Sequence, residues 1–239
     1  KQLTLVDYNI YKSIRVQELL NTAWNSDKLK HRSPNITHLL GRLNEISNFF
    51  CSMILWQQTK KERAQFISLF IRLGIHLRKL NNFHTLMGVV VALNRSSVSR
   101  LKFSLAECEP KLLQQFKTLE SLMDPTGSFK NYRKAIQNTK LPALPYLGVV
   151  LTDLTFIEDG NPDFIEDSVT GKKVINFTKR GMIYELVQTL LDYQNAPYMF
   201  PSFEPITTLV TEFLCETEKQ QYNLSLLHEP RGVDVKSIL

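Results

Sequence analysis

Apolar residues recur at intervals of three and four through most of this 239-residue chain. The spacing is clearest after Ser33-Pro34, where it runs through Ile36, Leu39, Leu40, Leu43, Ile46, Phe49, Phe50 and Met53. Residues at this spacing share one face of an α-helix. A serine caps the start of a helix and a proline fits its first turn. The pattern therefore predicts a helix that begins at Pro34 and buries one face.

The same periodicity continues along the chain and predicts an all-α protein. Further helices are expected at residues 60–80, 86–93, 110–122, 132–137, 183–191 and 206–214. Residues 149–157 resist this interpretation, because their β-branched and aromatic side chains favour a strand when taken alone. No internal boundary stands out, so residues 1–239 are predicted to form a single helical domain.

Composition narrows the possible functions. No apolar run reaches the roughly 20 residues that a membrane-spanning helix needs. Cys51, Cys108 and Cys215 are widely separated, which argues against a disulfide framework or a zinc site and favours a reducing, cytoplasmic setting. The formal net charge of +6 comes from basic residues interleaved with acids. An acidic protein partner or an anionic membrane surface fits this pattern better than nucleic acid. Because the chain begins at Lys1, a fragment of a longer protein is expected.

The sequence lacks the familiar motifs of covalent catalysis and of metal or cofactor binding. There is no GxSxG, HExxH, P-loop or GxGxxG. The histidines have no carboxylate or cysteine at ligand spacing and are expected at the surface or the edge of the core: His31, His38, His76, His84 and His228. Neighbouring carboxylates on a helix diverge by about 100°, so Glu158 and Asp159 do not form a converging acid–base pair. We expect neither a covalent enzyme nor a metal or cofactor site.

Residues 141–180 predict a protruding hairpin. A proline-punctuated entry leads into an apolar run that ends at Glu158 and Asp159. Gly160-Asn161-Pro162 then breaks the chain, and a second run opens at Asn176 and continues into Lys179-Arg180. One arm would thus end in acidic residues and the other would return with basic ones.

Several motifs, in order, resemble the catalytic domain of Ras guanine-nucleotide exchange factors of the Son-of-sevenless type. The matching segments are Arg42-Leu43-Asn44, Ser47-Asn48-Phe49, Leu80-Asn81-Asn82-Phe83, Ala92-Leu93-Asn94, Ser97-Val98-Ser99-Arg100-Leu101, Phe129-Lys130-Asn131-Tyr132-Arg133, Pro145-Tyr146-Leu147-Gly148, the run from Leu151 to Pro162, and Ile175-Asn176-Phe177. The resemblance covers essentially the whole chain. It implies an all-α domain with a protruding helical hairpin at about 147–194, and a helix rather than a strand at 149–157.

The resemblance also implies a mechanism. Members of this family hold the switch II region of a small GTPase and push the hairpin between switch I and the nucleotide. Asp159 matches the carboxylate that competes with phosphate, Glu158 adds negative charge beside it, and Thr155 matches the position that fills the magnesium site. The residues that match the pocket for switch II and its edge are Tyr146, Phe177, Met87, Phe129, Leu40 and Asn94. The implied partner is a Ras-family GTPase, preferably free of nucleotide, with membrane contact only through the lipidated GTPase.

Departures from the family pattern leave alternatives open. Asp159 replaces the usual glutamate and is one methylene shorter, and Gly181-Met182 replace two basic residues. These changes keep open a non-catalytic domain that binds a GTPase without exchanging its nucleotide. Relatives directed at Rap tend to have histidine where this chain has Glu158, so Ras is the expected partner and Rap the alternative.

Overall fold

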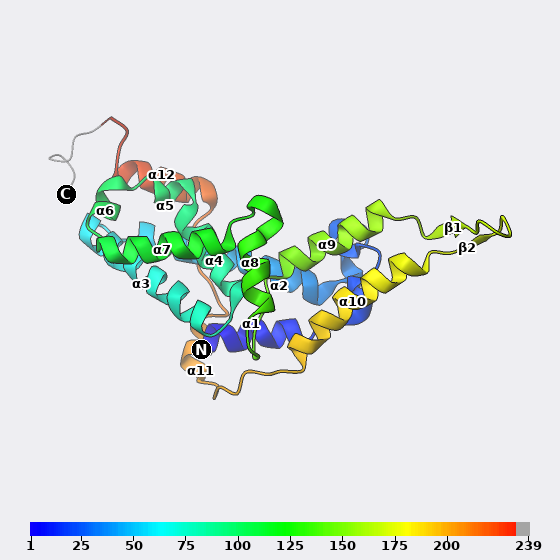
Figure 1. The fold of residues 1–239 in the computed structure, drawn as a ribbon. Coiled ribbons are helices and arrows are strands. Elements are labelled where there is room, and N and C mark those ends of the chain that lie inside the picture. Colours follow the sequence, from blue (N-terminus) through cyan, green and yellow to red (C-terminus); the bar gives the residue numbers. More distant parts are fainter. Residues whose placement is uncertain (233–239) are drawn as a thin grey trace.

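The computed structural model describes residues 1–232, and its architecture is helical (Figure 1). The α-helices are α1 Gln2–Lys12, α2 Pro34–Leu55, α3 Lys60–Lys79, α4 Phe83–Asn94, α5 Ser96–Ser99, α6 Lys102–Ala106, α7 Pro110–Met123, α8 Thr126–Gln137, α9 Leu147–Gly160, α10 Phe177–Gln194, α11 Glu204–Leu209 and α12 Glu218–His228. Short 3-10 turns follow α1, at η1 Val16–Leu19, η2 Ala23–Asn25 and η3 Lys30–Arg32. The strands β1 Phe164–Glu166 and β2 Lys173–Ile175 form a small antiparallel ribbon. The predicted all-α fold is confirmed.

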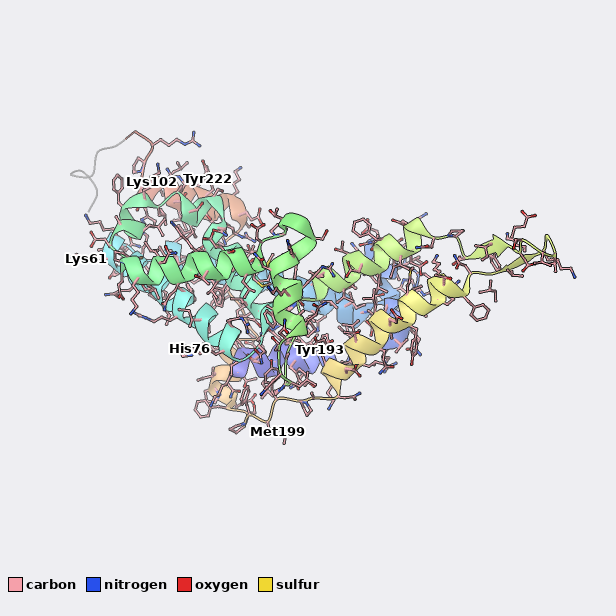
Figure 2. All side chains as sticks on the ribbon, in the orientation of Figure 1. Lys61, His76, Lys102, Tyr193, Met199 and Tyr222 are labelled. Atoms are coloured by element: carbon pink, nitrogen blue, oxygen red, sulfur yellow. The ribbon has the colours of Figure 1, made fainter. Side chains whose placement is uncertain are left out.

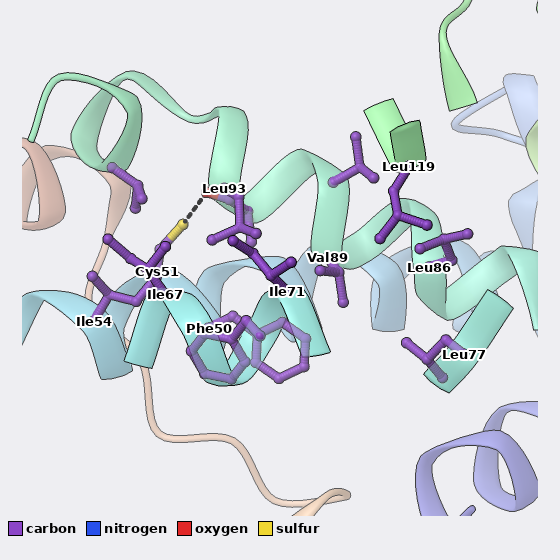
Figure 3. Packing of buried hydrophobic residues seen from close by; sticks show 14 of the residues in the cluster. Phe50, Cys51, Ile54, Ile67, Ile71, Leu77, Leu86, Val89, Leu93 and Leu119 are labelled. Atoms are coloured by element: carbon purple, nitrogen blue, oxygen red, sulfur yellow. Dashed lines mark hydrogen bonds between the residues drawn. The ribbon is translucent and has the colours of Figure 1, made fainter. Parts of the chain in front are cut away.

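The body of the molecule is built around the contacts of α2, α3, α4 and α7 (Figure 3). The apolar faces of these helices meet in one cluster, in which the rings of Phe50 and Phe70 stack with their centroids 4.4 Å apart. The start of α2 is as predicted, with Ser33 at the N-cap and Pro34 in the first turn. A fully buried aliphatic or aromatic side chain contributes about 1.5–3 kcal/mol to folding. This cluster therefore provides the rigid support for the rest of the chain.

A second apolar cluster fixes the base of the α9–α10 hairpin to the N-terminal segment. Leu147, Leu151 and Leu154 on α9 and Ile183, Val187 and Leu190 on α10 pack against α1, η1–η2 and the beginning of α2. The hydroxyl of Tyr11 donates to the carbonyl of Leu190 at 2.9 Å, and that of Tyr8 to the carbonyl of Gln194 at 2.7 Å. The N-terminal helix thus determines where the hairpin leaves the body.

Two of the motifs found in the sequence are structural. Arg42 is buried and pairs with the carboxylate of Asp7, which also accepts a hydrogen bond from Thr85, so α2, α1 and α4 are joined. Asn82 caps α4 by accepting from the amide of Thr85 at 2.9 Å. Its amide group donates to Thr4 at 3.0 Å. Breaking a buried ion pair costs about 3–5 kcal/mol, so these residues serve the fold.

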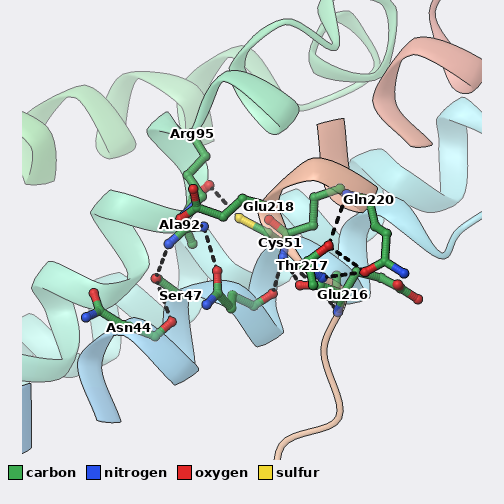
Figure 4. Close-up of polar contacts among 12 residues, drawn as sticks. Asn44, Ser47, Cys51, Ala92, Arg95, Glu216, Thr217, Glu218 and Gln220 are labelled. Carbon is green, nitrogen blue, oxygen red and sulfur yellow. Dashed lines mark hydrogen bonds and ion pairs between the residues drawn. The ribbon is translucent and has the colours of Figure 1, made fainter. Parts of the chain in front are cut away.

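Another polar network holds the C-terminal helix α12 on the body (Figure 4). The guanidinium of Arg95 donates to Asn48 and to Ser47, at 3.0 Å to the latter, and pairs with Glu218 of α12 at 3.0 Å. The side chain of Gln221 reaches back to the carbonyl of Asn48 at 3.0 Å. The Ser47-Asn48 motif therefore anchors α12, a helix that the sequence pattern did not predict.

Two local predictions were wrong. The helix expected at 206–214 is α11, Glu204–Leu209, and the chain after it is irregular until α12. His84 was expected at the surface or core edge but is fully buried between α2 and the ring of Tyr146. In each case tertiary contacts override local pattern.

Residues 149–157 lie within α9, so the helix implied by the resemblance is confirmed over the strand that composition favours. Leu147, Leu151 and Leu154 are spaced for one helical face, and all three are buried in the second apolar cluster.

Within residues 1–232, the structure has no helix long and apolar enough to cross a membrane.

Burial of His84 makes the fold sensitive to acid. Burial lowers the pKa of His84, and Arg42 lowers it further, while Asp7 and the carbonyl of Leu39 oppose the shift. The unfolded chain then takes up a proton at about pH 6.5 before the folded one does. Stability should stay level above this pH and fall below it; the pKa of His228 is also lowered by burial and adds to the loss.

Urea unfolding at pH 7.5 and 5.5 measures this effect. We expect His84→Gln to lose less stability between the two pH values than the wild type does. His38→Gln is the matched control, because His38 is exposed on α2. Equal acid sensitivity in all three proteins would contradict the role assigned to His84.

Candidate functional site

The helical hairpin is the most distinctive feature of the molecule. Helices α9 and α10 extend from the body in Figure 1, at the end opposite to α6 and α12. The protruding helical hairpin implied by the resemblance is present, and its two arms are Leu147–Gly160 and Phe177–Gln194. Beyond the helices, β1 and β2 continue the hairpin as a ribbon in which Phe164 pairs with Ile175. The side chains of this ribbon stand clear of the helical body (Figure 2).

Helix α8 holds the start of α9 through three residues. The ring of Phe129 lies 5.6 Å from that of Tyr146, centroid to centroid. The amide of Tyr146 donates to the hydroxyl of Tyr132 at 2.9 Å. The guanidinium of Arg133 forms a bidentate ion pair with Asp153, with both N–O distances 2.7 Å. The segment Phe129–Arg133, singled out in the sequence as a motif, thus sets the position of the hairpin.

Two of the residues predicted to receive the GTPase, Phe129 and Tyr146, are in ring contact. Met87, Phe129 and Tyr146 are half-buried and pack against the core of the body from α4, α8 and the entry to α9. Asn94 is exposed at the end of α4, seven residues after Met87, and so lies on the same helical face two turns further on. Phe129 and Tyr146 thus meet at the base of the hairpin, and Met87 and Asn94 share one face of α4.

Leu40 and Thr155 meet in a separate cleft of about 340 Å³ between η2 and α9, which Trp24 and Phe156 also line. The amide of Asn25 donates to the hydroxyl of Thr155 at 3.2 Å, and that hydroxyl donates to the carbonyl of Leu151 at 2.9 Å. The methyl group of Thr155 is therefore the part of this side chain left to meet a partner. Sequence reasoning missed Asn25, which no local pattern marks.

At the far end of α9, the two carboxylates are in different situations. Lys179 is only 3% exposed and pairs with Glu158 at 2.6 Å and with Asp163 at 3.0 Å. Burial alone would lower the pKa of Lys179, but its hydrogen bonds to Glu158 and Asp163 outweigh burial and raise it. Asp159 is exposed and forms no ion pair within the described part of the chain. Glu158 thus fastens α9 to α10, and Asp159 is the carboxylate free to meet a ligand.

Phe177 lies apart from the other predicted pocket residues. It is the first residue of α10, next to the tip of the hairpin, and is 78% exposed. Tyr146 precedes the opposite end of α9, about 20 Å away along a helix of this length. The structure therefore does not bring Phe177 together with Tyr146, Phe129 and Met87.

Residues 1–232 contain no group of three or more histidine, cysteine, aspartate or glutamate side chains placed to hold a metal ion. Burial raises the pKa of the Cys51 thiol to about 12, which leaves it uncharged and unreactive at neutral pH. The arrangement offers partly buried apolar side chains on the body, a cleft beside α9, and a projecting arm whose Asp159 carboxylate is exposed.

Comparison with known proteins identifies the family. The RasGEF domain model matches residues 1–181. The chain belongs to the RasGEF domain family. It is 43% identical over 232 residues to Ras guanine nucleotide exchange factor R of Dictyostelium discoideum, covering 97% of this chain and 13% of that protein. Factors J and A of the same organism are 41% and 38% identical, and the alignments cover 100% of this chain and 29% and 41% of the two relatives. The chain thus spans less than half the length of each of these relatives.

In this RasGEF domain, Gly181 stands where the family pattern has a basic residue, and a glycine at this position should lower the stability of α10. It lies in the second turn of α10, and an added Cβ would have no neighbour within 4 Å. Glycine inside a helix is about 1 kcal/mol less favourable than alanine. We expect Gly181→Ala to stabilise the hairpin by about this amount, measured as slower hydrogen exchange of the α10 amides. Gly232→Ala is the control, because its φ of +76° makes a side chain unfavourable there; no slowing in α10 would contradict the prediction.

Proposed function

We propose that this domain promotes release of GDP from a Ras-family small GTPase without covalent chemistry. The single observation that supports this most directly is the free carboxylate of Asp159 at the end of a helix that projects from the body. The GTPase would dock against Met87, Phe129, Tyr146 and Asn94, and α9 would then lie beside its nucleotide. The names of the related proteins point to the same activity.

The different roles of Glu158 and Asp159 fit such a mechanism. The pairing of Glu158 with Lys179 holds the end of α9 against α10, so that the arm keeps its shape when it is inserted. Asp159 then occupies hydrogen-bond donors that a phosphate would otherwise use. The methyl group of Thr155, one helical turn before Asp159, would fill the space of the magnesium ion.

Binding energies show why displacement alone suffices. Nanomolar to picomolar nucleotide affinity corresponds to about 12–16 kcal/mol, and each ~1.4 kcal/mol changes affinity tenfold. A domain that binds the empty GTPase more tightly than the loaded one lowers nucleotide affinity by the same factor. The cellular excess of GTP over GDP then sets the direction of exchange. Shape and a few displacing groups are therefore enough.

Release of fluorescent mant-GDP from purified Ras, Rap and Ral tests the proposal. We expect acceleration with Ras and less with Rap, because Glu158 stands where Rap-directed relatives tend to have histidine. Binding to the empty GTPase without acceleration would support the non-catalytic alternative, which the short Asp159 side chain keeps open. Absence of both binding and acceleration across the panel would refute the proposed function.

Tyr146 and Phe177 should both contribute to capture of the GTPase, at opposite ends of the hairpin. Tyr146→Ala removes a ring from the pocket and should weaken capture of nucleotide-free Ras by more than about 1 kcal/mol, as buried aromatic anchors commonly do. Phe177→Ala should also weaken capture, but only through contacts near the tip of the hairpin. Affinity is measured by titration, and thermal melting checks that each variant is folded. A folded Tyr146→Ala variant with wild-type affinity would remove this ring from the proposed interface.

A further inference from the structure

Residues 127–129 form a short run with an unusual backbone. Gly127, Ser128 and Phe129 have φ values of +64°, +57° and +62°, so three successive residues are left-handed. Residues with a side chain rarely adopt this conformation, and such strain persists only where neighbouring groups hold it in place. The strained run carries Phe129, one of the residues proposed to receive the GTPase.

Arg133 connects this run to the inserting helix. Its Nε donates to the carbonyl of Ser128 at 2.7 Å, while Nη1 and Nη2 donate to the two carboxylate oxygens of Asp153, each also at 2.7 Å. One rigid, planar guanidinium thus contacts the strained run on one edge and α9 on the other. The hydrogen bonds to Asp153 raise the pKa of Arg133 despite its partial burial.

Because the Arg133–Asp153 ion pair is partly exposed to solvent, we infer that it mainly fixes the angle of α9 and adds little to stability. The side chains of Arg133 and Asp153 are 37% and 24% exposed. Ion pairs that retain this much contact with water add little to stability. Asp153 lies two residues before Thr155 and six before Asp159, so a small tilt of α9 at Asp153 displaces the free carboxylate at the end of the arm.

We propose that Arg133 is a positioning residue that couples the strained run 127–129 to the angle of α9. Occupation of the docking pocket at Phe129 and placement of Asp159 beside the nucleotide then change together. This inference rests on the proposed exchange function. It assigns Arg133 a part in the step that follows docking, in which the end of α9 displaces the nucleotide. Lysine cannot replace Arg133, because a single ammonium group cannot make the fork to Asp153 and the contact to Ser128 together.

Exchange kinetics with Arg133→Lys, Arg133→Gln and Asp153→Asn test the coupling. Nucleotide release is measured over a range of domain concentrations, which separates half-saturation from the maximal rate. We expect each variant to lower the maximal rate about tenfold or more, as misplaced groups do, and to change half-saturation less than twofold. Arg133→Gln combined with Asp153→Asn should be no slower than either alone. The control is Lys60→Gln, which removes a comparably exposed ion pair to Glu107 on the body.

A second measurement does not depend on activity. Hydrogen exchange of Arg133→Gln should be faster than wild type in both α9 and residues 126–130, and Lys60→Gln should change neither. If the wild type fails to accelerate release from any GTPase, the proposed function is wrong and hydrogen exchange alone decides the coupling. Three results would each contradict the coupling. They are a wild-type maximal rate in Arg133→Gln, a double variant that is slower than either single variant, and faster hydrogen exchange in only one of the two segments. Should Arg133→Gln fail to fold, Arg133→Lys serves in both measurements.

Discussion

Asp159→Ala is expected to slow GDP release about 10- to 100-fold, which corresponds to about 1.4 to 2.7 kcal/mol on the barrier. The substitution removes the one carboxylate at the end of α9 that is free to take the place of a phosphate. Hydrogen bonds to a charged acceptor are roughly twice as strong as neutral ones, so losing them should slow the step at which the nucleotide leaves. Capture of the empty GTPase should change little, because the proposed docking residues Met87, Phe129 and Tyr146 on the body are untouched.

Glu158→Gln is the matched control for this experiment. It removes the charge next along the helix, but Glu158 is engaged by Lys179, so any effect should come through a looser hairpin. We expect Asp159→Glu to equal or exceed the wild type if the short side chain limits reach. Release rates are measured at saturating domain, together with affinity for the empty GTPase. If Asp159→Ala accelerates release as well as the wild type does, Asp159 has no direct role.

The sequence predicted the fold well where a pattern is local and long. Helix α2 follows from Ser33-Pro34 and eight apolar residues at helical spacing, and the hairpin follows from the break at Gly160-Asn161-Pro162. The helix α12 was missed because its polar surface gives no clear apolar stripe; it is held by Arg95 and by the contacts of Gln221 instead. Periodicity reports burial along one face and says nothing of such polar anchoring.

The candidate site was predicted less completely, because it depends on contacts between distant segments. The resemblance grouped Phe177 with Phe129 and Tyr146. The rings of Phe129 and Tyr146 meet, with centroids 5.6 Å apart, but Phe177 lies at the far end of the hairpin. The different surroundings of Glu158 and Asp159 depend on Lys179, 20 or more residues later in the chain. Neighbouring positions on a helix face different partners, and only the packed structure shows which one is free.

Nucleotide is expected to dissolve the complex between this domain and its GTPase, whichever nucleotide is added. A domain that lowers nucleotide affinity must itself be bound less tightly once nucleotide is present. The free charge of Asp159 strengthens this exclusion, because a carboxylate and a phosphate repel each other strongly in a confined site. An effector-like binder would behave differently, since it would prefer the GTP-loaded GTPase and stay bound.

Gel filtration of the domain with Ras stripped of nucleotide by EDTA and phosphatase measures this behaviour. The two proteins should elute together, and should separate when either GDP or GTP is added with magnesium. Asp159→Ala should form the same complex but need more nucleotide to dissolve it, because the two negative groups no longer compete for one place. A complex that survives GTP and dissolves only with GDP would show that α9 does not occupy the nucleotide site, and that the domain recognises the loaded GTPase instead.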